Sequence, residues 1–293
     1  MQQFSIRDIE QLCGIKAHTL RIWEQRYQLG VAGRNCGQHR VYNNEDLKQW
    51  LRIAYLYHRG YKISLIAGLA PAAMEKKLEA HFLEDNSDSA VIHQLTEASL
   101  DFNKEQFERI IHAAVLRSGI THGILHIFYP YLQRIGLLWL TDHAIPAQEH
   151  FASHIIRKKI IMATDGLLPP EPSATTILVF APTGEFHEIP LLTANYFFRK
   201  AGLRTVYFGS NVSLESLRYY LERKPVKYLY THVITCLSTA SPEEYLSALA
   251  GFFKGTLLSS GPVFGNMMTP GVSQVHLLAP VDLISFAEKL AAG

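Results

Sequence analysis

The sequence predicts a multidomain protein with three parts: a small α-helical head, a helical bundle, and an α/β domain built on a doubly wound parallel sheet. Before residue 168, apolar residues recur at steps of three and four, which is the period of α-helices. From Thr175 onward, short apolar runs alternate with amphipathic helical stretches, as they do in parallel sheets. The 293 residues also exceed what one hydrophobic core usually holds. We therefore expect domains at residues 1–73, 74–167 and 174–293.

Charge, cysteine content and hydropathy narrow the class of protein. The net charge is +2 and 48% of the residues are hydrophobic, as in ordinary globular chains. Met1–Lys62 holds ten Lys and Arg residues against five Asp and Glu residues, and this basic excess favours a polyanionic partner. Cys13, Cys36 and Cys236 show no paired spacing, which indicates neither disulfides nor zinc and suits a reducing cytoplasm. Without a long apolar run, we expect a soluble, cytoplasmic protein that does not bind membranes.

A helix-turn-helix is predicted at the N-terminus. The first helix starts at Ser5, and Gly14 permits the tight turn after it. The second helix is expected over Ala17–Arg26, with Leu20, Ile22 and Trp23 packed inward. Residues near the start of such a helix meet base edges in the major groove, and its arginines meet phosphates. The residues expected to face DNA are His18, Thr19, Arg21, Gln25 and Arg26.

The segment after the second helix carries a more specific pattern. Arg26-Tyr27 is followed by Arg34 and then by Arg40-Val41-Tyr42, with Asp46-Leu47 opening the next helix. This pattern resembles the MerR family, which implies a winged helix-turn-helix that binds double-stranded operator DNA. By that resemblance, the residues on or beside the wing are Arg34, His39, Arg40 and Tyr42. Asn43 or Asn44 is expected to cap a helix over Glu45–Arg59. The alternative is a helix-turn-helix used only for contacts between proteins.

Residues 74–167 show helical periodicity and are expected to form a bundle of four or five helices. Within it, Trp139 is followed after nine residues by Glu149-His150. This spacing resembles the Trp-x9-Glu-His motif of cobalamin-dependent light-sensing regulators of the CarH and LitR type. The resemblance implies that Trp139 packs on the 5′-deoxyadenosyl group of adenosylcobalamin and that Glu149 holds its ribose hydroxyls. It leaves open whether His143 or His150 serves as an upper axial ligand.

Two histidine pairs in the bundle have the spacing of a helix face. They are His122 with His126 and His150 with His154. No third ligand stands at a matching offset, so we interpret both pairs as surface or packing residues rather than as a zinc site.

The α/β domain carries a histidine motif directly after its first strand. Glu185-Phe186-His187 follows the apolar run that ends at Ala181, and ligands bind at the carboxyl ends of strands in open α/β sheets. An imidazole there can bind a metal through one ring nitrogen while Glu185 accepts the other ring N–H. The pattern resembles the Asp/Glu-x-His-x-x-Gly signature of cobalamin-binding domains, in which the histidine is the lower axial ligand to cobalt. Pro190 stands where that family has glycine.

Two further segments of the α/β domain resemble cobalamin-binding motifs. Thr235-Cys236-Leu237 resembles the family's Ser-x-Leu, whose hydroxyl meets the buried nucleotide tail of the cofactor. Ser260-Gly261 stands where the family usually has Gly-Gly. The implied cofactor contacts are Thr235, Leu237, Ser260 and Gly261. The domain lacks the glycine-rich G-x-G-x-x-G pattern of dinucleotide sites.

Together the three parts resemble cobalamin-dependent MerR-type repressors with a Rossmann-like domain. The resemblance implies a transcriptional regulator, not an enzyme, with adenosylcobalamin held by His187 below and covered by Trp139 and Glu149 above. Cofactor and light would then control its assembly into a homo-oligomer on DNA. One alternative is a MerR-type regulator that has lost cobalamin or uses another ligand or partner, because Pro190, Thr235 and Ser260 depart from the family pattern. Another is a cobalamin-dependent methyltransferase or mutase subunit, which leaves the head unexplained.

Overall fold

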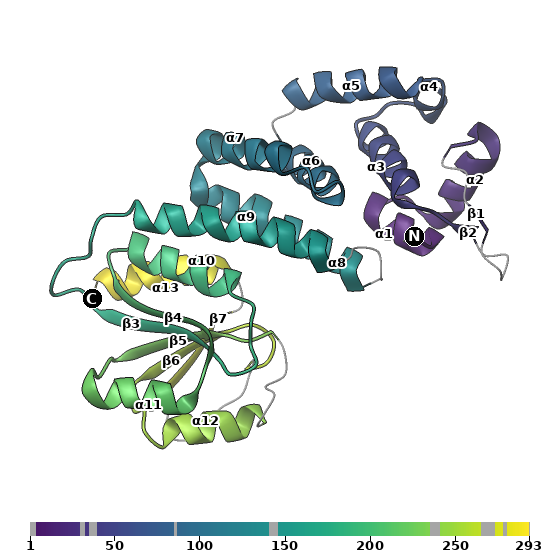
Figure 1. Cartoon of the computed structure of the whole chain (residues 1–293). Coiled ribbons are helices and arrows are strands. Elements are labelled where there is room, and N and C mark those ends of the chain that lie inside the picture. Colours follow the sequence, from purple (N-terminus) through teal and green to yellow (C-terminus); the bar gives the residue numbers. More distant parts are fainter. Residues whose placement is uncertain are drawn as a thin grey trace. The chain divides into compact units, whose positions relative to one another are not determined.

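The computed structural model describes residues 4–29, 33–34, 40–84, 87–140, 146–234, 241–264, 273–277 and 280–292. The chain divides into two compact units, Met1–His154 (unit 1) and Ile155–Gly293 (unit 2), and the division falls inside helix α9 (Pro146–Asp165) (Figure 1). The division into three domains stays a prediction.

Unit 1 is helical apart from one short hairpin (Figure 1). The elements of the head are α1 (Ile6–Cys13), α2 (Ala17–Tyr27), β1 (Gly33–Arg34), β2 (Arg40–Val41), α3 (Asn44–His58) and α4 (Ile63–Ala67). The elements that follow are α5 (Pro71–Glu84), α6 (Asp88–Leu100), α7 (Lys104–His122), the π-helix η1 (Gly123–Phe128), α8 (Tyr129–Leu140) and the first part of α9. Among the described helices, none is long and apolar enough to cross a membrane.

The helix-turn-helix has the predicted turn but a different inward face on its second helix. Gly14, between α1 and α2, has a φ of +66°, a conformation that glycine adopts at little cost. Leu20 and Trp23 are buried as predicted, whereas Ile22 is 52% exposed and its predicted inward packing is wrong. The reason is geometric: residues three apart share a helix face, while Ile22 lies about 100° around the axis from Trp23.

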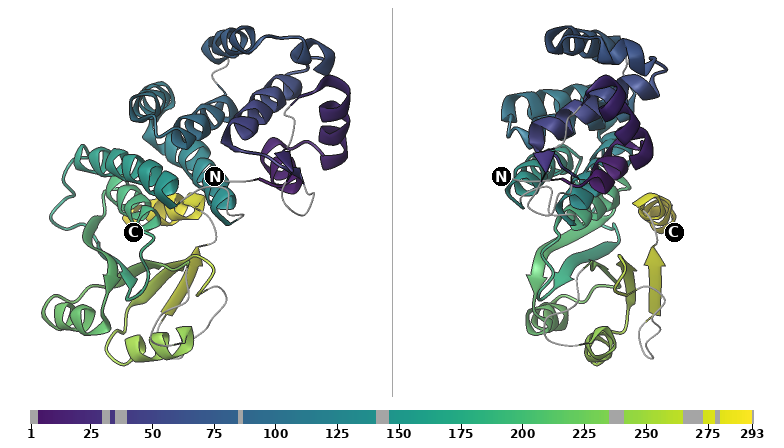
Figure 2. Two further views of the ribbon diagram at one scale, coloured as in Figure 1. Left: turned by 45° about the vertical axis from the view of Figure 1, so that its right-hand side comes forward. Right: turned by 90° about the vertical axis from the view of Figure 1, so that its right-hand side faces the viewer.

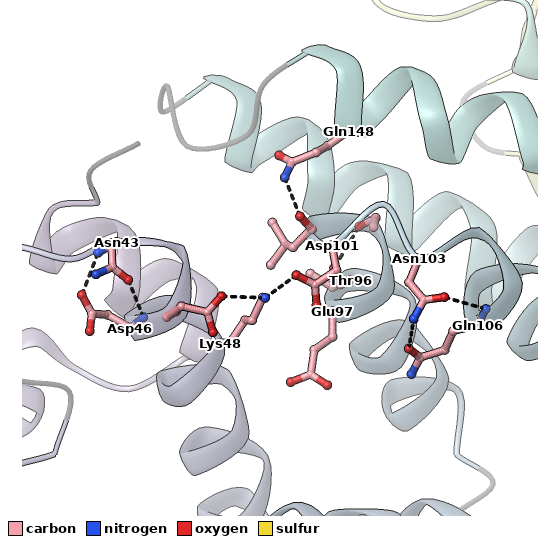
Figure 3. Close-up of polar contacts among 12 residues, drawn as sticks. Asn43, Asp46, Lys48, Thr96, Glu97, Asp101, Asn103, Gln106 and Gln148 are labelled. Carbon is pink, nitrogen blue, oxygen red and sulfur yellow. Dashed lines mark hydrogen bonds and ion pairs between the residues drawn. The ribbon is translucent and has the colours of Figure 1, made fainter. Parts of the chain in front are cut away.

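The helix after the hairpin begins at a capping box. The Asn43 side chain accepts a hydrogen bond from the Asp46 backbone N–H at 3.0 Å, and the Asp46 carboxylate accepts one from the Asn43 N–H at 2.8 Å (Figure 3). Both bonds satisfy donors that would otherwise lack an intrahelical partner. Asn43, one of the two predicted candidates, is therefore the N-cap, and α3 starts at Asn44, one residue before the predicted start.

The bundle changes its helical geometry where α7 meets α8. Gly119 has a φ of +80° inside α7, where the backbone departs from helical geometry. The π-helix η1 follows and ends just before Pro130, which lies in the first turn of α8. Because proline has no backbone N–H, it removes one intrahelical hydrogen bond at this joint. Phe107, Phe128 and Tyr131 are fully buried around this joint.

Within unit 1, ion pairs connect α3 of the head to α6 of the bundle. Lys48 contacts Asp101 (Figure 3). Arg52 Nε lies 3.1 Å from Glu97 Oε1. Arg52 and Glu97 are largely buried, so their pairing is screened less by solvent than a surface pair is. On α9, the Gln148 amide donates to the Leu100 carbonyl at 2.9 Å, which ties the end of α6 to α9.

The buried His93 on α6 predicts a loss of stability in acid. Burial, and then the charges of Arg134 and Arg52, lower the pKa of His93 from 6.5 to about 3. Between these two pH values the unfolded chain takes up a proton that the native chain does not. The free energy of unfolding should therefore fall as the pH drops through this window, by at most about 1.4 kcal/mol per pH unit from this group.

The comparison of wild type with His93→Phe isolates this effect, because phenylalanine keeps the ring but does not titrate. Urea unfolding at pH 7 and pH 5 should show a smaller acid loss in His93→Phe than in the wild type. Glu97, whose pKa is raised by burial, contributes with the opposite sign to both proteins. The control His112→Phe changes an exposed histidine on α7 and should keep the wild-type slope. Equal slopes in all three proteins would refute the assignment.

Unit 2 is a five-stranded parallel sheet with helices on both faces. Its strands are β3 (Thr176–Pro182), β4 (Arg204–Val212), β5 (Tyr228–His232), β6 (Thr256–Ser260) and β7 (Ser273–Leu277). Its helices after α9 are α10 (Ile189–Lys200), α11 (Leu214–Arg223), α12 (Pro242–Ala250) and α13 (Pro280–Ala292). Figures 1 and 2 show α10 and α13 on one face and α11 and α12 on the other. This is the predicted doubly wound, Rossmann-like architecture.

The strand order fixes where a ligand site can form. The order is β4-β3-β5-β6-β7, so the chain first adds β4 on one side of β3 and then β5 on the other. The connection therefore reverses between β3 and β5, and in open α/β sheets ligands bind outside the carboxyl ends of the strands at such a point. Leu178 and Phe180 of β3 are fully buried beneath it, packed with Leu217 of α11 and Leu249 of α12.

Candidate functional site

The candidate metal ligand, His187, lies in the loop between β3 and α10 and is oriented by Glu185. The His187 Nδ1–H donates to Glu185 Oε1 at 2.6 Å, and the His187 backbone N–H donates to the same oxygen at 2.8 Å. Glu185 is fully buried, whereas the His187 side chain is 47% exposed. The hydrogen bond from Nδ1 to Glu185 is the one that the sequence predicted, and it makes Nε2 the ring nitrogen through which His187 would bind a metal.

Glu185 also connects the two loops at the reversal point of the sheet. Its second carboxylate oxygen, Oε2, accepts a hydrogen bond from the backbone N–H of Ile234, just after β5, at 2.7 Å. One buried carboxylate thus accepts hydrogen bonds from both sides of the crevice. Hydrogen bonds to a charged acceptor are stronger than those between neutral groups. The role of Ile234 was not predicted, since a backbone N–H leaves no signal in side-chain patterns.

The end of β4 fixes the other side of the His187 loop. Asn211 has a φ of +60°, a conformation that asparagine tolerates better than most residues. Its side-chain oxygen accepts from the Gly184 N–H at 3.0 Å, and its own backbone N–H donates to the Glu185 carbonyl at 3.1 Å. These two hydrogen bonds restrain the backbone of the loop that carries His187.

Glu188 holds the start of α10 through two polar contacts. It contacts Arg157 on α9, and it accepts a hydrogen bond from the Tyr207 hydroxyl at 3.1 Å. Burial and the nearby Glu188 charge raise the pKa of Tyr207, so this phenol stays protonated and acts as a donor. Pro190 is buried in the first turn of α10, where a proline needs no N–H partner. Its ring therefore packs inside the fold.

Phe186, next to His187, is an exposed aromatic residue whose role was not predicted from the sequence. Its side chain is 68% exposed although it lies between the buried Glu185 and the half-exposed His187. An exposed apolar ring beside a candidate metal ligand can contact a flat apolar group. The sequence signal that could have identified Phe186 is its position between Glu185 and His187 in the motif.

Ser260 and Gly261 lie at the end of β6 and support the loop after β5. The Ser260 hydroxyl is hydrogen-bonded to the Tyr230 hydroxyl at 2.7 Å and to His232 Nδ1 at 2.6 Å. Gly261 has a φ of +86°, and a Cβ there would lie 2.4 Å from the carbonyl oxygen of Val233. The backbone of this loop therefore requires glycine at position 261. Thr235 and Leu237, the other predicted contacts, lie outside the described residues.

Replacing Gly261 by alanine should destabilise unit 2. The added methyl group meets the Val233 carbonyl and forces an L-residue into a positive φ, which together should cost about 1–3 kcal/mol. The matched control is Gly136→Ala on α8, where an added Cβ meets nothing within 4 Å and a helical alanine is favoured. Thermal unfolding should show a lower Tm for Gly261→Ala only. An unchanged Tm would contradict the described loop conformation.

Unit 1 contains the predicted upper-side residues. Glu149 and His150 lie in the first turn of α9, with His150 Nδ1 3.1 Å from Glu149 Oε2, and the His150 side chain is 76% exposed. Trp139 lies on α8, but its side chain is outside the described part, as is all of His143. Their contacts with a cofactor stay predictions.

The histidine pair on α7 and η1 has a structural partner. His122 Nε2 lies 3.0 and 2.9 Å from the two carboxylate oxygens of Asp88, and its ring lies 4.5 Å from that of His126. In the described ranges, no three His, Cys, Asp or Glu side chains gather as a metal site.

The candidate DNA surface is the exposed face of α2. His18, Arg21, Gln25 and Arg26 are exposed and Thr19 is partly exposed. Helix α2 is the second helix of the helix-turn-helix, the one that enters the major groove in this motif. The structure therefore leaves all five predicted residues of this helix accessible to DNA.

The residues of the β1–β2 hairpin differ in whether their side chains can bind a DNA phosphate. Arg40 Nε forms an ion pair with Glu24 Oε2 of α2 at 2.9 Å, so a phosphate would have to share or replace this partner. Arg34 pairs with Arg40 through the β1–β2 backbone. The Arg34 side chain and all of His39 lie outside the described residues.

Tyr42 does not offer its side chain to DNA. It is 1% exposed, and its backbone pairs with Phe4 through hydrogen bonds of 2.7 and 2.9 Å. Burial raises the pKa of Tyr42 to about 12. Its burial contradicts the predicted contact with the DNA backbone and assigns it instead to the core beneath the hairpin. The cause is the long-range pairing with the N-terminus, which no local pattern reveals.

Two protein-family models match parts of the chain, and neither match extends to Glu185 or His187. Residues 4–73 match the MerR HTH family of regulatory proteins, and residues 91–163 match the B12 binding domain. The chain is therefore similar to MerR-type DNA-binding regulators over its head and to B12 binding domains over the helical segment that follows, which supports a DNA-binding regulator.

Two transcriptional repressors are similar to this chain over most of their length and most of its own. The chain is 27% identical to the HTH-type transcriptional repressor CarA of Myxococcus xanthus over 216 residues, which cover 73% of this chain and 70% of CarA. It is 25% identical to the repressor CarH of the same organism over 224 residues, covering 73% of each chain. These similarities confirm the predicted resemblance to CarH-type regulators.

A solved structure shares the fold. The monomethylamine corrinoid protein of Methanosarcina barkeri aligns with 70% of this chain and 100% of its own length, with a TM-score of 0.53 and 12% sequence identity. At this identity the likeness concerns the fold alone. The support for a cobalamin cofactor comes from the match of residues 91–163 to the B12 binding domain.

Proposed function

We propose that the chain is a transcriptional repressor whose assembly and DNA affinity are controlled by adenosylcobalamin and light. The observation that carries the proposal is the pair of Glu185 and His187 at the reversal point of the sheet, with Nδ1 2.6 Å from a buried carboxylate. A histidine so oriented has the donor chemistry of a cobalt ligand. The similarity to CarA and CarH supports the repressor role.

The residues of unit 2 fit a corrinoid in three respects. His187 offers Nε2, Glu185 fixes the ring tautomer, and Phe186 offers an exposed apolar surface. Gly261 keeps the loop after β6 free of a side chain, and the Pro190 ring is buried. We propose that Thr235, Leu237 and the Ser260 loop contact the nucleotide tail.

In unit 1, we propose that Trp139 packs on the adenosyl group and that Glu149 binds its ribose hydroxyls, with His150 or His143 near the upper face. Bound adenosylcobalamin would supply a bond between cobalt and carbon that light breaks. The residues of this chain bind the cofactor differently before and after that event. A ligand that interacts differently with two states shifts the balance between them.

The DNA-binding part of the proposal rests on α2. Its exposed arginines would contact phosphates and His18 and Thr19 would contact base edges. We propose a homo-oligomer, because several heads on repeated half-sites bind more tightly than one head. Under this proposal the protein has no catalytic activity.

The test is an absorption spectrum of the purified protein mixed with adenosylcobalamin, recorded before and after illumination and paired with DNA binding. The proposal predicts a coloured complex after gel filtration, a spectral change on illumination, and DNA affinity that differs between dark and light. Colourless protein with intact DNA binding would instead favour a MerR-type regulator that uses another ligand. A coloured complex with equal DNA affinity in both conditions would refute control by light.

A further inference from the structure

A cavity of about 500 Å³ lies within unit 1, lined by residues of α1, α3, α6 and α8. This volume is within the range of pockets that bind small molecules. None of the residues proposed to contact cobalamin or DNA lines it.

The base of the cavity is largely apolar. Leu51, Ala54 and Tyr55 of α3 are buried there, and the Tyr55 ring stacks on the buried His93 ring with centroids 5.3 Å apart. The low pKa of His93 keeps its imidazole neutral at pH 7. The base therefore offers a flat surface to an apolar or aromatic group.

The cavity wall and mouth are cationic. Arg134 of α8 and Arg59 at the end of α3 both line the cavity, and the Arg59 guanidinium lies 5.4 Å from the centroid of the Tyr55 ring. Burial lowers the pKa of Arg134, so water solvates this cation only partly. The described residues that line the cavity include no Asp or Glu. An anionic group in the cavity would be attracted by two guanidinium groups, the side chains best suited to bind carboxylate or phosphate in a bidentate way.

We propose that this cavity binds a small organic anion, a carboxylate or phosphate monoester on an apolar or aromatic body. The anionic group contacts Arg134 and Arg59, and the body lies against Leu51 and Tyr55. The site is distinct from the proposed cobalamin residues and gives the regulator a second chemical input.

The same cavity connects the ligand to the DNA-binding helix. Cys13 and Gly14, which form its α1 side, directly precede α2, and the Cys13 carbonyl is hydrogen-bonded to His58 Nε2 at 2.8 Å. A ligand held against this turn contacts the segment that sets the position of α2. Ligand occupancy would therefore be coupled to DNA binding through the position of α2.

Isothermal titration of the full chain with phenyl phosphate and with benzoate tests the site, with neutral benzyl alcohol as the uncharged probe. Both anions should bind, and the alcohol should bind at least about tenfold more weakly. Arg134→Gln should weaken anion binding at least about tenfold, whereas Arg109→Gln, an exposed arginine on α7, should bind like the wild type.

Two further variants keep the test decisive if Arg134→Gln does not fold. Arg59→Gln removes the cation at the mouth and should also weaken anion binding. Ala54→Leu fills the base and should block all three probes. Failure of both anions to bind the wild type, or wild-type binding by Ala54→Leu, would overturn the site. DNA affinity that is identical with and without saturating phenyl phosphate would overturn the coupling, whereas a change of about threefold or more would support it.

Discussion

Replacing His187 by alanine is expected to weaken cobalamin binding by more than about 100-fold. Loss of a residue that orients a metal ligand already costs about 10- to 100-fold in affinity, and here the ligand itself is removed. Glu185→Gln should weaken cobalamin binding by about 10- to 100-fold, because Glu185 orients the ligand. It keeps the size of the buried side chain but removes the charge that accepts hydrogen bonds from His187 and Ile234.

Equilibrium dialysis with adenosylcobalamin measures both effects. His112→Ala, at an exposed position on α7, is the matched histidine control and should bind like the wild type. Circular dichroism should show that His187→Ala remains folded, since its side chain is half exposed. Wild-type affinity in a folded His187→Ala protein would refute the axial-ligand assignment while leaving the DNA-binding assignments intact.

The double substitution Arg21→Ala and Arg26→Ala is expected to weaken DNA binding strongly and across sequences. Each arginine that contacts a phosphate releases counterions, so the slope of log affinity against log salt should fall by about one for each lost contact and by about two for both. Both side chains are exposed on α2, and so the variant should fold normally. Fluorescence anisotropy at several salt concentrations gives the slope.

The control for this experiment is Arg109→Ala, which removes the same charge from the bundle. It should leave the slope unchanged. Arg40→Ala is expected to change the slope less than the loss of Arg21 or Arg26, because Glu24 already pairs with Arg40. An unaltered slope in the double variant would show that α2 does not bind the DNA backbone.

Local sequence patterns predicted much of this fold. Gly14 marked the turn of the helix-turn-helix, and the pair Asn43-Asn44 marked the start of α3. The hydrogen bond from His187 to Glu185 was also predictable, since residues two apart in a tight loop can reach one another. In each case the decisive interaction lies within a few residues along the chain.

Features that depend on distant pairing were not predictable in this way. Tyr42 is buried because it pairs with Phe4, and Arg40 meets Glu24 across 16 residues. Ile234 meets Glu185 across 49 residues and only through its backbone. The cavity beside Arg134 needs four helices packed together before its charge imbalance can be seen. Such contacts are set by topology, and one sequence without its fold does not reveal them.

The most direct test of the cobalamin assignment is electron paramagnetic resonance of the complex with cobalt reduced to the paramagnetic cobalt(II) state. The unpaired electron couples to an axial nitrogen, so the nitrogen's isotope determines the splitting. In protein labelled with nitrogen-15 histidine, the account predicts that the splitting changes to that of nitrogen-15 and that this signal is lost in His187→Ala. A splitting that keeps the nitrogen-14 pattern would show that the cofactor's own base, and not His187, binds the cobalt.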